Sequence, residues 1–537
     1  MPGAMSRGPA AASAARPPGP DHASRGPASA WRWVEAVTVA VVAVAAVAFR
    51  FTTRSPLWLD EALSVNIAKL PIGDIPGALR HDGHPPLYYV LLHGWMSLFG
   101  SGDVAVRALS GIFGLALFPL MWVAGRRLAG RHGAWTAVLV LAVSPYAIRY
   151  STETRMYSLV MVLGLAAWLV AWDALKEPTL LRLGGLALLT GALLWSHYWA
   201  MWFLAAATLL LLGRIVLARR AGRTDEVGPT VRVIGALVVG GVLFLPWVAA
   251  LLYQSAHTGT PWAGPEQPAE VVAQSLSDLG GGPSGDSVLL GILLLVLILL
   301  ALFGRGVDSR HVELDLATQR DARPLLGQIV LTMAIAMLVS YATSSAFASR
   351  YLAIIVPLIF LAVALGLTRL GRGIAYRVVL GLVLALGVIG GGRNVVTART
   401  QAGDVADAIK ANLHPGDLVI TCPDQLGPAL SRELPDDVRV EVYPSFGSPL
   451  RIDWADYTER LAKADPAAFG AEAIRRAGDG AIWYAWSGSY KTHKGTCETV
   501  LNSMLKERPW ATNPVVDGGD DFFEHEALWR LPAKEGG

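Results

Sequence analysis

Long apolar runs separated by short polar stretches dominate the first 395 residues of the chain. A helix needs roughly 20 residues to cross the hydrocarbon of a bilayer, and flanking residues make up the length of a shorter run. About eleven runs qualify, which predicts a polytopic α-helical membrane protein. They cover residues 33–49, 104–124, 133–148, 156–175, 183–198, 201–217, 231–253, 287–303, 325–342, 351–367 and 375–389.

Basic residues gather on alternate connections between these runs. By the positive-inside rule, those connections and the N-terminal tail face the cytoplasm. The basic clusters are Arg126, Arg127 and Arg131; Lys176 and Arg182; Arg214 to Arg223; residues 305–323; and Arg369 to Arg377. Alternation then places the other connections outside: the first outer loop (50–103), the turns at Glu153, His197 and Arg350, the loop 254–286, and the chain after residue 396.

The two ends of the chain differ from the membrane part, 31–395. Residues 1–30 are rich in Ala, Pro, Gly, Ser and Arg without apolar periodicity, which predicts a disordered cytoplasmic tail. The run 33–49 lacks a convincing signal cleavage site and is expected to be an uncleaved first span. Residues 396–537 carry many charges and no run that crosses a bilayer, which predicts a soluble periplasmic domain.

Within this C-terminal region, alternating patterns indicate an α/β domain. The expected strands are 417–422, 438–443 and 481–486, and the expected helices are 405–413 and 471–477. The aromatic residues of this region either form its core or offer stacking faces to a carbohydrate. They are Trp483, Tyr484, Trp486 and Tyr490.

Composition supports the membrane assignment and narrows the function. The chain of 537 residues is 53% hydrophobic with a net charge of +3, and its basic residues report orientation rather than a nucleic-acid surface. The sequence has no Walker A motif, no GxGxxG after a strand, no HExxH and no zinc-type cysteine spacing. Cys422 and Cys497 are either one disulfide, if this region faces an oxidising compartment, or two free thiols.

Two adjacent carboxylates, Asp60 and Glu61, follow the first apolar run. Partial desolvation at a membrane boundary raises the proton affinity of a carboxylate, which suits it to act as a general base. The alternative is an ordinary solvated loop. His84 and Tyr88 follow within the same loop, together with a Pro-Pro pair, and this company favours a site.

Three further outer turns carry candidate groups. One turn holds Glu153, Arg155 and Tyr157, where the acid and the arginine either have a task or simply pair with each other. His197 stands in the next turn, beside tryptophans expected in the interfacial aromatic belt. Arg350 begins the third, where its guanidinium either binds phosphate through paired donors, with the Tyr351 phenol as a further donor, or snorkels to the interface.

Four motifs resemble the membrane glycosyltransferases of the GT-C superfamily, in the branch of protein O-mannosyltransferases and bacterial aminoarabinose transferases. The motifs are WLDEA (58–62), HPPLYYVLLH (84–93), YSTETRMYSL (150–159) and SRYL (349–352). The membrane part, 31–395, fits the layout of these enzymes, and the C-terminal domain adds little. The composition, rich in Ala, Gly and Arg and poor in Lys, is typical of an actinobacterial source.

The resemblance implies transfer of a sugar from a polyprenyl-phosphate donor to an acceptor at the outer face of the plasma membrane, with inversion. Asp60 matches the catalytic acid, with Glu61 beside it. Arg350, Tyr351 and Arg155 are then expected to bind the donor phosphate. The expected acceptor or supporting residues are His84, Glu153, Tyr157, His197 and Tyr88. No cofactor is implied beyond a possible divalent cation, for which Asp60, Glu61 and Glu153 are the candidate ligands.

The sugar and the acceptor stay open at this point. Mannose is the first expectation, arabinose the alternative, and the acceptor is a lipoglycan, a glycolipid or a secreted protein. A lipid or sugar transporter is the rival from another class. Transporters place functional charges near the bilayer midplane and commonly show repeated halves, whereas here the charges gather at one face.

Overall fold

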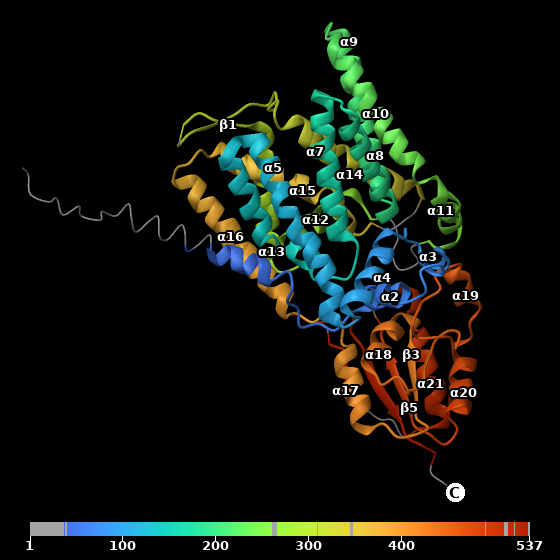
Figure 1. Cartoon of the computed structure of the whole chain (residues 1–537). Coiled ribbons are helices and arrows are strands. Elements are labelled where there is room, and N and C mark those ends of the chain that lie inside the picture. The colour runs from blue at the N-terminus through green and yellow to red at the C-terminus, as the bar shows by residue number, and fades with distance from the viewer. Residues whose placement is uncertain are drawn as a thin grey trace, which may run out of the picture. The chain divides into compact units, whose positions relative to one another are not determined.

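The computed structural model describes residues 37, 40–259, 266–308, 310–343, 347–488, 490–509, 514–519 and 521–534 (Figure 1). The predicted tail 1–30 lies outside the described residues, as does part of the first predicted span, of which residues 40–48 are helical. The chain divides into two units, Met1–Val44 and Ala45–Gly537, and every candidate site residue belongs to the second.

Helices make up the membrane part, in agreement with the apolar runs. Among the described residues, six helices are long and apolar enough to cross a membrane, or seven if α10 and α11, which meet at 67°, form one span. The six are α5 (Asp103–Val143), α7 (Tyr157–Lys176), α9 (Ala200–Arg220), α13 (Gly285–Phe303), α14 (Arg323–Thr343) and α16 (Ile374–Val396). The bent pair is α10 (Val227–Val242) with α11 (Leu245–His257), and two shorter apolar helices are α8 (Leu180–Ser196) and α15 (Val356–Arg369).

Helix α5 contains two of the predicted spans. Its backbone breaks at Ala129 and at Gly130, whose φ of +63° suits a residue without a side chain. The chain reverses at this break. The backbones on its two sides come so close that a Cβ on Gly125 would lie 2.6 Å from the carbonyl oxygen of Gly133. When α5 is divided at this break, each predicted run from residue 104 onward is largely helical. The run 231–253 covers the bent pair α10 and α11, and the run 133–148 continues into α6 (Pro145–Ser151). The count of eleven crossings nevertheless stays a prediction.

Helix α15 lies at the centre of the bundle. Every residue from Val356 to Leu367 is buried, and a helix that is apolar all round is one that other helices enclose. Helices α5 and α13 pack against it. The short 3-10 helix η2 (Ser349–Ile354) leads directly into α15, so the position of Arg350 is set by the most enclosed helix of this part.

The first outer loop, 50–103, is largely helical in the structure. It contains α2 (Leu59–Ala68), α3 (Ile75–Asp82) and the apolar α4 (Leu87–Phe99). Two other short helices complete the segments around the candidate site, α6 (Pro145–Ser151) and α12 (Pro268–Gly280). The connection that is rich in basic residues before α14 carries a small antiparallel hairpin of β1 (Gly304–Gly306) and β2 (Val312–Leu314).

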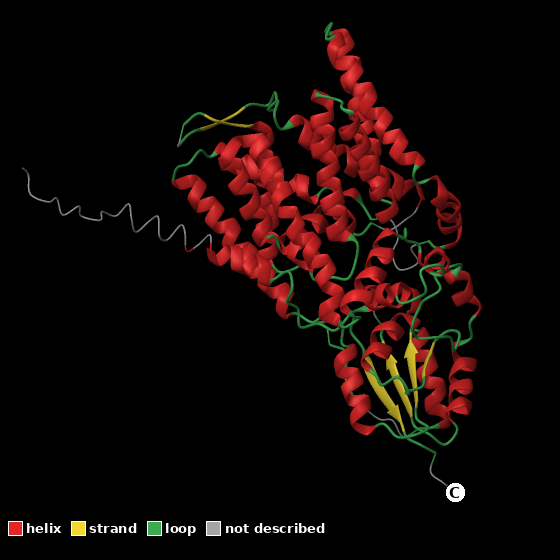
Figure 2. Cartoon of the chain, viewed as in Figure 1, coloured by secondary structure: helices red, strands yellow, loops and turns green. Residues whose placement is uncertain are grey.

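The chain after residue 400 forms a four-stranded sheet in the order β4-β3-β5-β6 (Figure 2). Strands β3 (Leu418–Cys422), β4 (Val440–Val442) and β5 (Ile482–Trp486) are parallel, and β6 (Ala527–Leu531) pairs antiparallel with β5. The three predicted strands are therefore present. The helices are α17 (Ala402–Asn412), α18 (Gly427–Glu433), α19 (Tyr457–Lys463), α20 (Pro466–Ala477) and α21 (Thr496–Glu507).

Helices cover both faces of this sheet. Leu418 and Ile420 pack with residues of α20 and α21, whereas Val419 and Trp483 pack with residues of α17 and α18. Such alternation follows from the two-residue period of a strand. Trp483 and Tyr484 are buried in these clusters, so they are core residues rather than stacking faces. Cys422 and Cys497 form a disulfide that joins the end of β3 to the start of α21.

Candidate active site

The first turn of α2 points two neighbouring carboxylates in different directions. Leu59 is the first helical residue, so Asp60 and Glu61 lie in the first turn, where the helix dipole stabilises negative charge. Successive residues of a helix differ by about 100° in direction. The two acids, which are equivalent in the sequence, therefore have different partners.

Asp60 faces Arg350. The distance from its Oδ2 to Nη1 of Arg350 is 3.4 Å, and the side chains are 17% and 22% exposed. This ion pair brings together two segments that are nearly 300 residues apart in the chain. Both side chains are thus partly exposed.

Glu61 is fully buried and bound by arginines. Arg107 donates from Nε to Oε1 at 2.8 Å and from Nη2 to Oε2 at 2.6 Å, and the backbone N–H of Thr154 donates to Oε1 at 2.9 Å. Nη1 of Arg399 lies 3.6 Å from Oε2. Burial alone would raise the pKa of Glu61, but Arg107 and then Arg399 outweigh it and leave this pKa below its usual value. The carboxylate is therefore an anchor within the protein, with no oxygen left for a substrate.

Arg155 is held over the start of α2. Its Nη1 donates to the hydroxyls of Ser64 at 3.0 Å and Tyr89 at 3.3 Å, and contacts the carbonyl oxygen of Asp60 at 3.5 Å. The side chain is only 3% exposed. Arg155 does not form the pair with Glu153 that the sequence left open, since Glu153 accepts from Arg149 at 3.2 Å.

A chain of hydrogen bonds fixes His84 beside Arg155. Nη2 of Arg155 donates to Nε2 of His84 at 2.9 Å, because a guanidinium has no acceptor. The ring proton therefore resides on Nδ1 and is donated to Oδ2 of Asp82 at 2.8 Å. Burial opposes the charge of Asp82, but His84 and then Arg155 outweigh burial and lower the pKa of this carboxyl. His84 thus connects Arg155 to Asp82.

Several polar atoms that converge here have no hydrogen-bond partner among the described residues, although buried polar groups normally have one. They are Oδ2 of Asp60, Nε of Arg155, Nε of Arg350 and the hydroxyl of Tyr157. Three of these four atoms are donors, and two belong to cations. An anion with several oxygens fits such a set better than a neutral group does.

Aromatic rings enclose the same region. His197 lies with its ring centroid 5.4 Å from that of Tyr351 and 6.0 Å from that of Tyr157. Trp199 packs on Tyr351 at 5.2 Å. His197, which stood as a candidate in its own turn, therefore joins Tyr157 and Tyr351 in one aromatic wall.

Tyr88 and Glu153 are both buried. The hydroxyls of Tyr88 and Ser110 are 3.1 Å apart, and Ser110 in turn donates to the carbonyl oxygen of Arg155, so Tyr88 supports the turn rather than facing Asp60. Glu153 is 1% exposed and lies 4.0 Å from Arg399.

Two of the three candidate metal ligands, Glu61 and Glu153, have arginine partners. Arg107 and Arg399 surround the carboxylate of Glu61, and arginines also approach Glu153, so a divalent cation would face positive charge on that side. Among the described residues, no group of three or more His, Cys, Asp and Glu side chains has an arrangement that could hold a metal.

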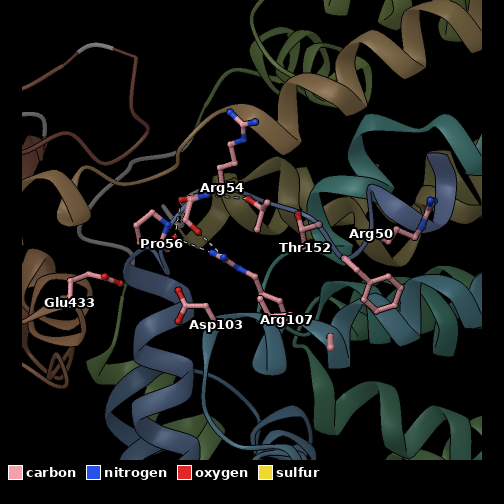
Figure 3. A pocket seen from close by; sticks show the side chains of 12 residues that line it. Arg50, Arg54, Pro56, Asp103, Arg107, Thr152 and Glu433 are labelled. Carbon is pink, nitrogen blue, oxygen red and sulfur yellow. Dashed lines mark hydrogen bonds between the residues drawn. The ribbon is translucent and has the colours of Figure 1, made fainter. Parts of the chain in front are cut away.

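A cavity of about 300 Å³ is lined by Arg107 but not by Asp60, Glu61 or Arg350. Figure 3 shows Arg54, Asp103, Arg107 and Glu433 around it. The polar groups of its buried wall are already engaged: Arg107 donates to Glu61 and to two backbone carbonyls, and Asp103 accepts from Arg432. This cavity is separate from the ion pair of Asp60 and Arg350.

Sequence reasoning missed the two arginines that hold Glu61. Arg107 stands at the outer end of a predicted span, where a charge in an apolar run is a sign of a buried partner. Arg399 follows the last span, at the entry to the C-terminal domain. Their shared partner is far from both in the sequence, so the pattern alone did not connect them.

The chain resembles known proteins in part of its sequence and in its fold. Residues 83–249 match the family model described as dolichyl-phosphate-mannose-protein mannosyltransferase. No curated protein sequence gives a significant match. Among solved structures, apo ArnT from Cupriavidus metallidurans has 13% identity and a TM-score of 0.57, over 94% of this chain and 98% of that one.

The structure of the same ArnT bound to undecaprenyl phosphate gives 14% identity and a TM-score of 0.56, over 95% of this chain and 99% of that one. At such identity the likeness concerns the fold alone, and it agrees with the predicted polytopic α-helical architecture. The chain is thus similar in fold to ArnT over nearly its whole length, and similar over residues 83–249 to the protein mannosyltransferase family.

Proposed function

We propose that the protein is an inverting glycosyltransferase of the plasma membrane that uses a polyprenyl-phosphate sugar. Mannose is the first candidate sugar and arabinose the second, and the acceptor is a lipoglycan, a glycolipid or a secreted protein at the outer face. The observation that carries the proposal is the ion pair of Asp60 with Arg350, beside Arg155 and the Tyr157 hydroxyl.

These residues fit the chemistry of the transfer. Asp60 removes the proton from the acceptor hydroxyl, whose oxygen forms a bond to the anomeric carbon. The bond from that carbon to the phosphate oxygen breaks on the opposite face, and the polyprenyl phosphate leaves with an added negative charge. Arg350 and Arg155 stabilise this charge where it develops, and the Tyr351 and Tyr157 phenols line the same region.

The ion pair links donor binding to the base. In the structure Arg350 is the cation that faces Asp60. A donor phosphate offers Arg350 a second anionic partner, and a guanidinium that turns to it leaves Asp60 free to accept a proton. Glu61 then acts as an anchor that holds the first turn of α2, rather than as a second base.

The location of the charges favours a transferase over a transporter. Asp60 lies in α2 and Arg350 in η2, and neither element is among the apolar helices long enough to span a membrane. A transporter is expected to place such groups near the midplane of its spans. The outer position of this end, the span count and the domain boundary at residue 396 are parts of the same proposal.

Purified protein incubated with radiolabelled polyprenyl-phosphate mannose or arabinose tests the proposal. Transfer of label to a membrane or protein acceptor supports it, and Arg350→Ala should weaken binding of polyprenyl phosphate about tenfold or more. Arg320→Ala, an exposed arginine before α14, is the matched control and should not change binding. Movement of the lipid across proteoliposomes without any transfer would instead identify a transporter.

A further inference from the structure

The three residues Leu59, Asp60 and Glu61 are held on both sides of the candidate base. On one side, Arg107 and Arg399 bind the Glu61 carboxylate. On the other, the backbone N–H of Leu59 donates to Oε2 of Glu524 at 3.4 Å, across 465 residues of sequence. The candidate base is the member of this tripeptide whose carboxylate remains accessible.

Glu524 provides a hydrogen-bond acceptor for the first turn of α2. The first N–H groups of a helix have no partner within the helix, and a side-chain oxygen just before it usually accepts from one of them. Among the described residues around this turn, Trp58 stands at that position and makes no such bond. The carboxyl of Glu524 accepts from the N–H of the first helical residue instead, so α2 is completed by a distant segment.

Glu524 is itself firmly positioned. Its backbone N–H donates to the carbonyl oxygen of Arg399 at 2.8 Å, and its carbonyl oxygen accepts from the N–H of Gln401 at 3.0 Å. The Tyr490 hydroxyl donates to its Oε1 at 3.1 Å. The segment that carries Glu524 is thus paired with the residue that also approaches Glu61.

Aromatic packing fixes the same junction. The Phe523 ring lies edge-on to the Trp58 ring, with centroids 5.2 Å apart. Trp58 and Leu59 also share a buried cluster with Ile452, Trp454 and Tyr457 of the C-terminal domain. Rotation or sliding of the first turn of α2 would break these contacts.

We propose that Glu524 is a positioning residue for Asp60, and that the C-terminal domain completes the active site by holding the first turn of α2 through Glu524 and Phe523. The proposal rests on the function proposed above. It also gives the C-terminal domain a role in catalysis that acts through the position of α2.

The variant Glu524→Gln distinguishes a hydrogen-bonding role of Glu524 from a role of its negative charge. In Glu524→Gln the side-chain oxygen still accepts from Leu59, whereas Glu524→Ala removes the acceptor. A misplaced base slows the chemical step, since catalysis depends strongly on the orientation of the reacting groups. We therefore expect kcat to fall about tenfold to 100-fold in Glu524→Ala with the KM for the donor unchanged, and to be largely retained in Glu524→Gln.

Two measurements on the full-length protein in detergent test the proposal. Hydrogen exchange of residues 58–62 should be faster in Glu524→Ala than in wild type or Glu524→Gln, and this result does not depend on any transferase activity. Glu459→Ala, an exposed glutamate of α19, serves as the control and should change neither exchange nor kcat.

The outcomes are distinguishable. If wild type transfers no sugar while exchange follows the expected order, the proposed function fails and the structural role of Glu524 stands. If Glu524→Ala leaves both kcat and exchange unchanged, or raises KM for the donor with kcat intact, the positioning role is wrong. If Glu524→Gln loses as much activity as Glu524→Ala, the charge rather than the hydrogen bond matters, and the proposal is likewise overturned.

Discussion

Asp60 and Arg350 form an ion pair in which neither side chain is fully buried and neither is fully exposed. On the function proposed above, this partial exposure leaves the pair open to competition from a donor phosphate. The exposure distinguishes it from the adjacent pair of Glu61 and Arg107, where both partners are nearly inaccessible.

Asp60→Asn should abolish sugar transfer and leave donor binding intact. Loss of a general base slows the chemical step by about 10²- to 10⁴-fold. The lipid phosphate should bind as tightly as in wild type or more tightly, because Arg350 no longer has a competing carboxylate. Titration of the purified variant with polyprenyl phosphate, alongside a transfer assay, checks both parts. Weaker phosphate binding would show that Asp60 does not compete for Arg350.

Glu61→Gln should lower the free energy of unfolding far more than the loss of an exposed carboxylate does. It leaves Arg107 and Arg399 buried without a full counter-charge, and breaking a buried pair lowers the free energy of unfolding by about 3–5 kcal/mol. The matched control is Glu177→Gln, which removes an exposed partner of Arg182 and should cost less than about 1 kcal/mol. Thermal unfolding of both variants in the same detergent gives the comparison, and equal shifts would contradict the anchoring role.

The stability of the C-terminal domain should depend on Glu524 as the pH rises. Burial, more than the nearby Asp60, raises the pKa of Glu524 to about 7, and burial together with Glu524 raises the pKa of Glu526. The folded protein then holds a proton more tightly than the unfolded chain does. The contribution of Glu524 to the free energy of unfolding is therefore full below about pH 4, and it falls as the pH rises towards 7.

Glu524→Gln should remove part of this fall. Unfolding curves of wild type and variant between pH 4 and pH 7 test the sign: the variant should gain stability relative to wild type as the pH rises. A constant difference across the range would mean that Glu524 titrates normally.

Reduction of the Cys422–Cys497 disulfide should loosen the C-terminal domain. The bond closes a loop with a sequence separation of 75 residues, and constraint of the unfolded chain predicts a stabilisation of about 4 kcal/mol. Cys422→Ser with Cys497→Ser should lower the unfolding temperature to that of the reduced wild type. Mass spectrometry of unreduced protein provides the check, since alkylation of both thiols would contradict the disulfide.

The sequence predicted those features that depend on local patterns. A span needs only a continuous apolar run, and the runs from residue 104 onward are largely helical because a bilayer imposes that requirement on each segment separately. The reversal inside α5 was visible as the basic stretch around Arg127, and the strands β3 and β5 as alternating runs. These features need no knowledge of distant residues.

Local patterns could not predict the different roles of Asp60 and Glu61. Both are acids in the same helical turn, and only their partners separate them: Arg350 for Asp60, and Arg107 with Arg399 for Glu61. Each of these pairings closes a long loop of chain, so it leaves no periodic trace in the sequence. The Glu524 contact with Leu59 is hidden for the same reason.

The contact between Leu59 and Glu524 has a consequence for how the protein is made. The two residues are 465 positions apart, so the helix that carries Asp60 is synthesised long before its stabilising carboxyl. A nascent chain that stops short of residue 524 contains Asp60, Arg155 and Arg350, yet lacks the contact that fixes the acid. On the function proposed above, full activity would therefore arrive late in biosynthesis, once Glu524 has been synthesised and has reached α2.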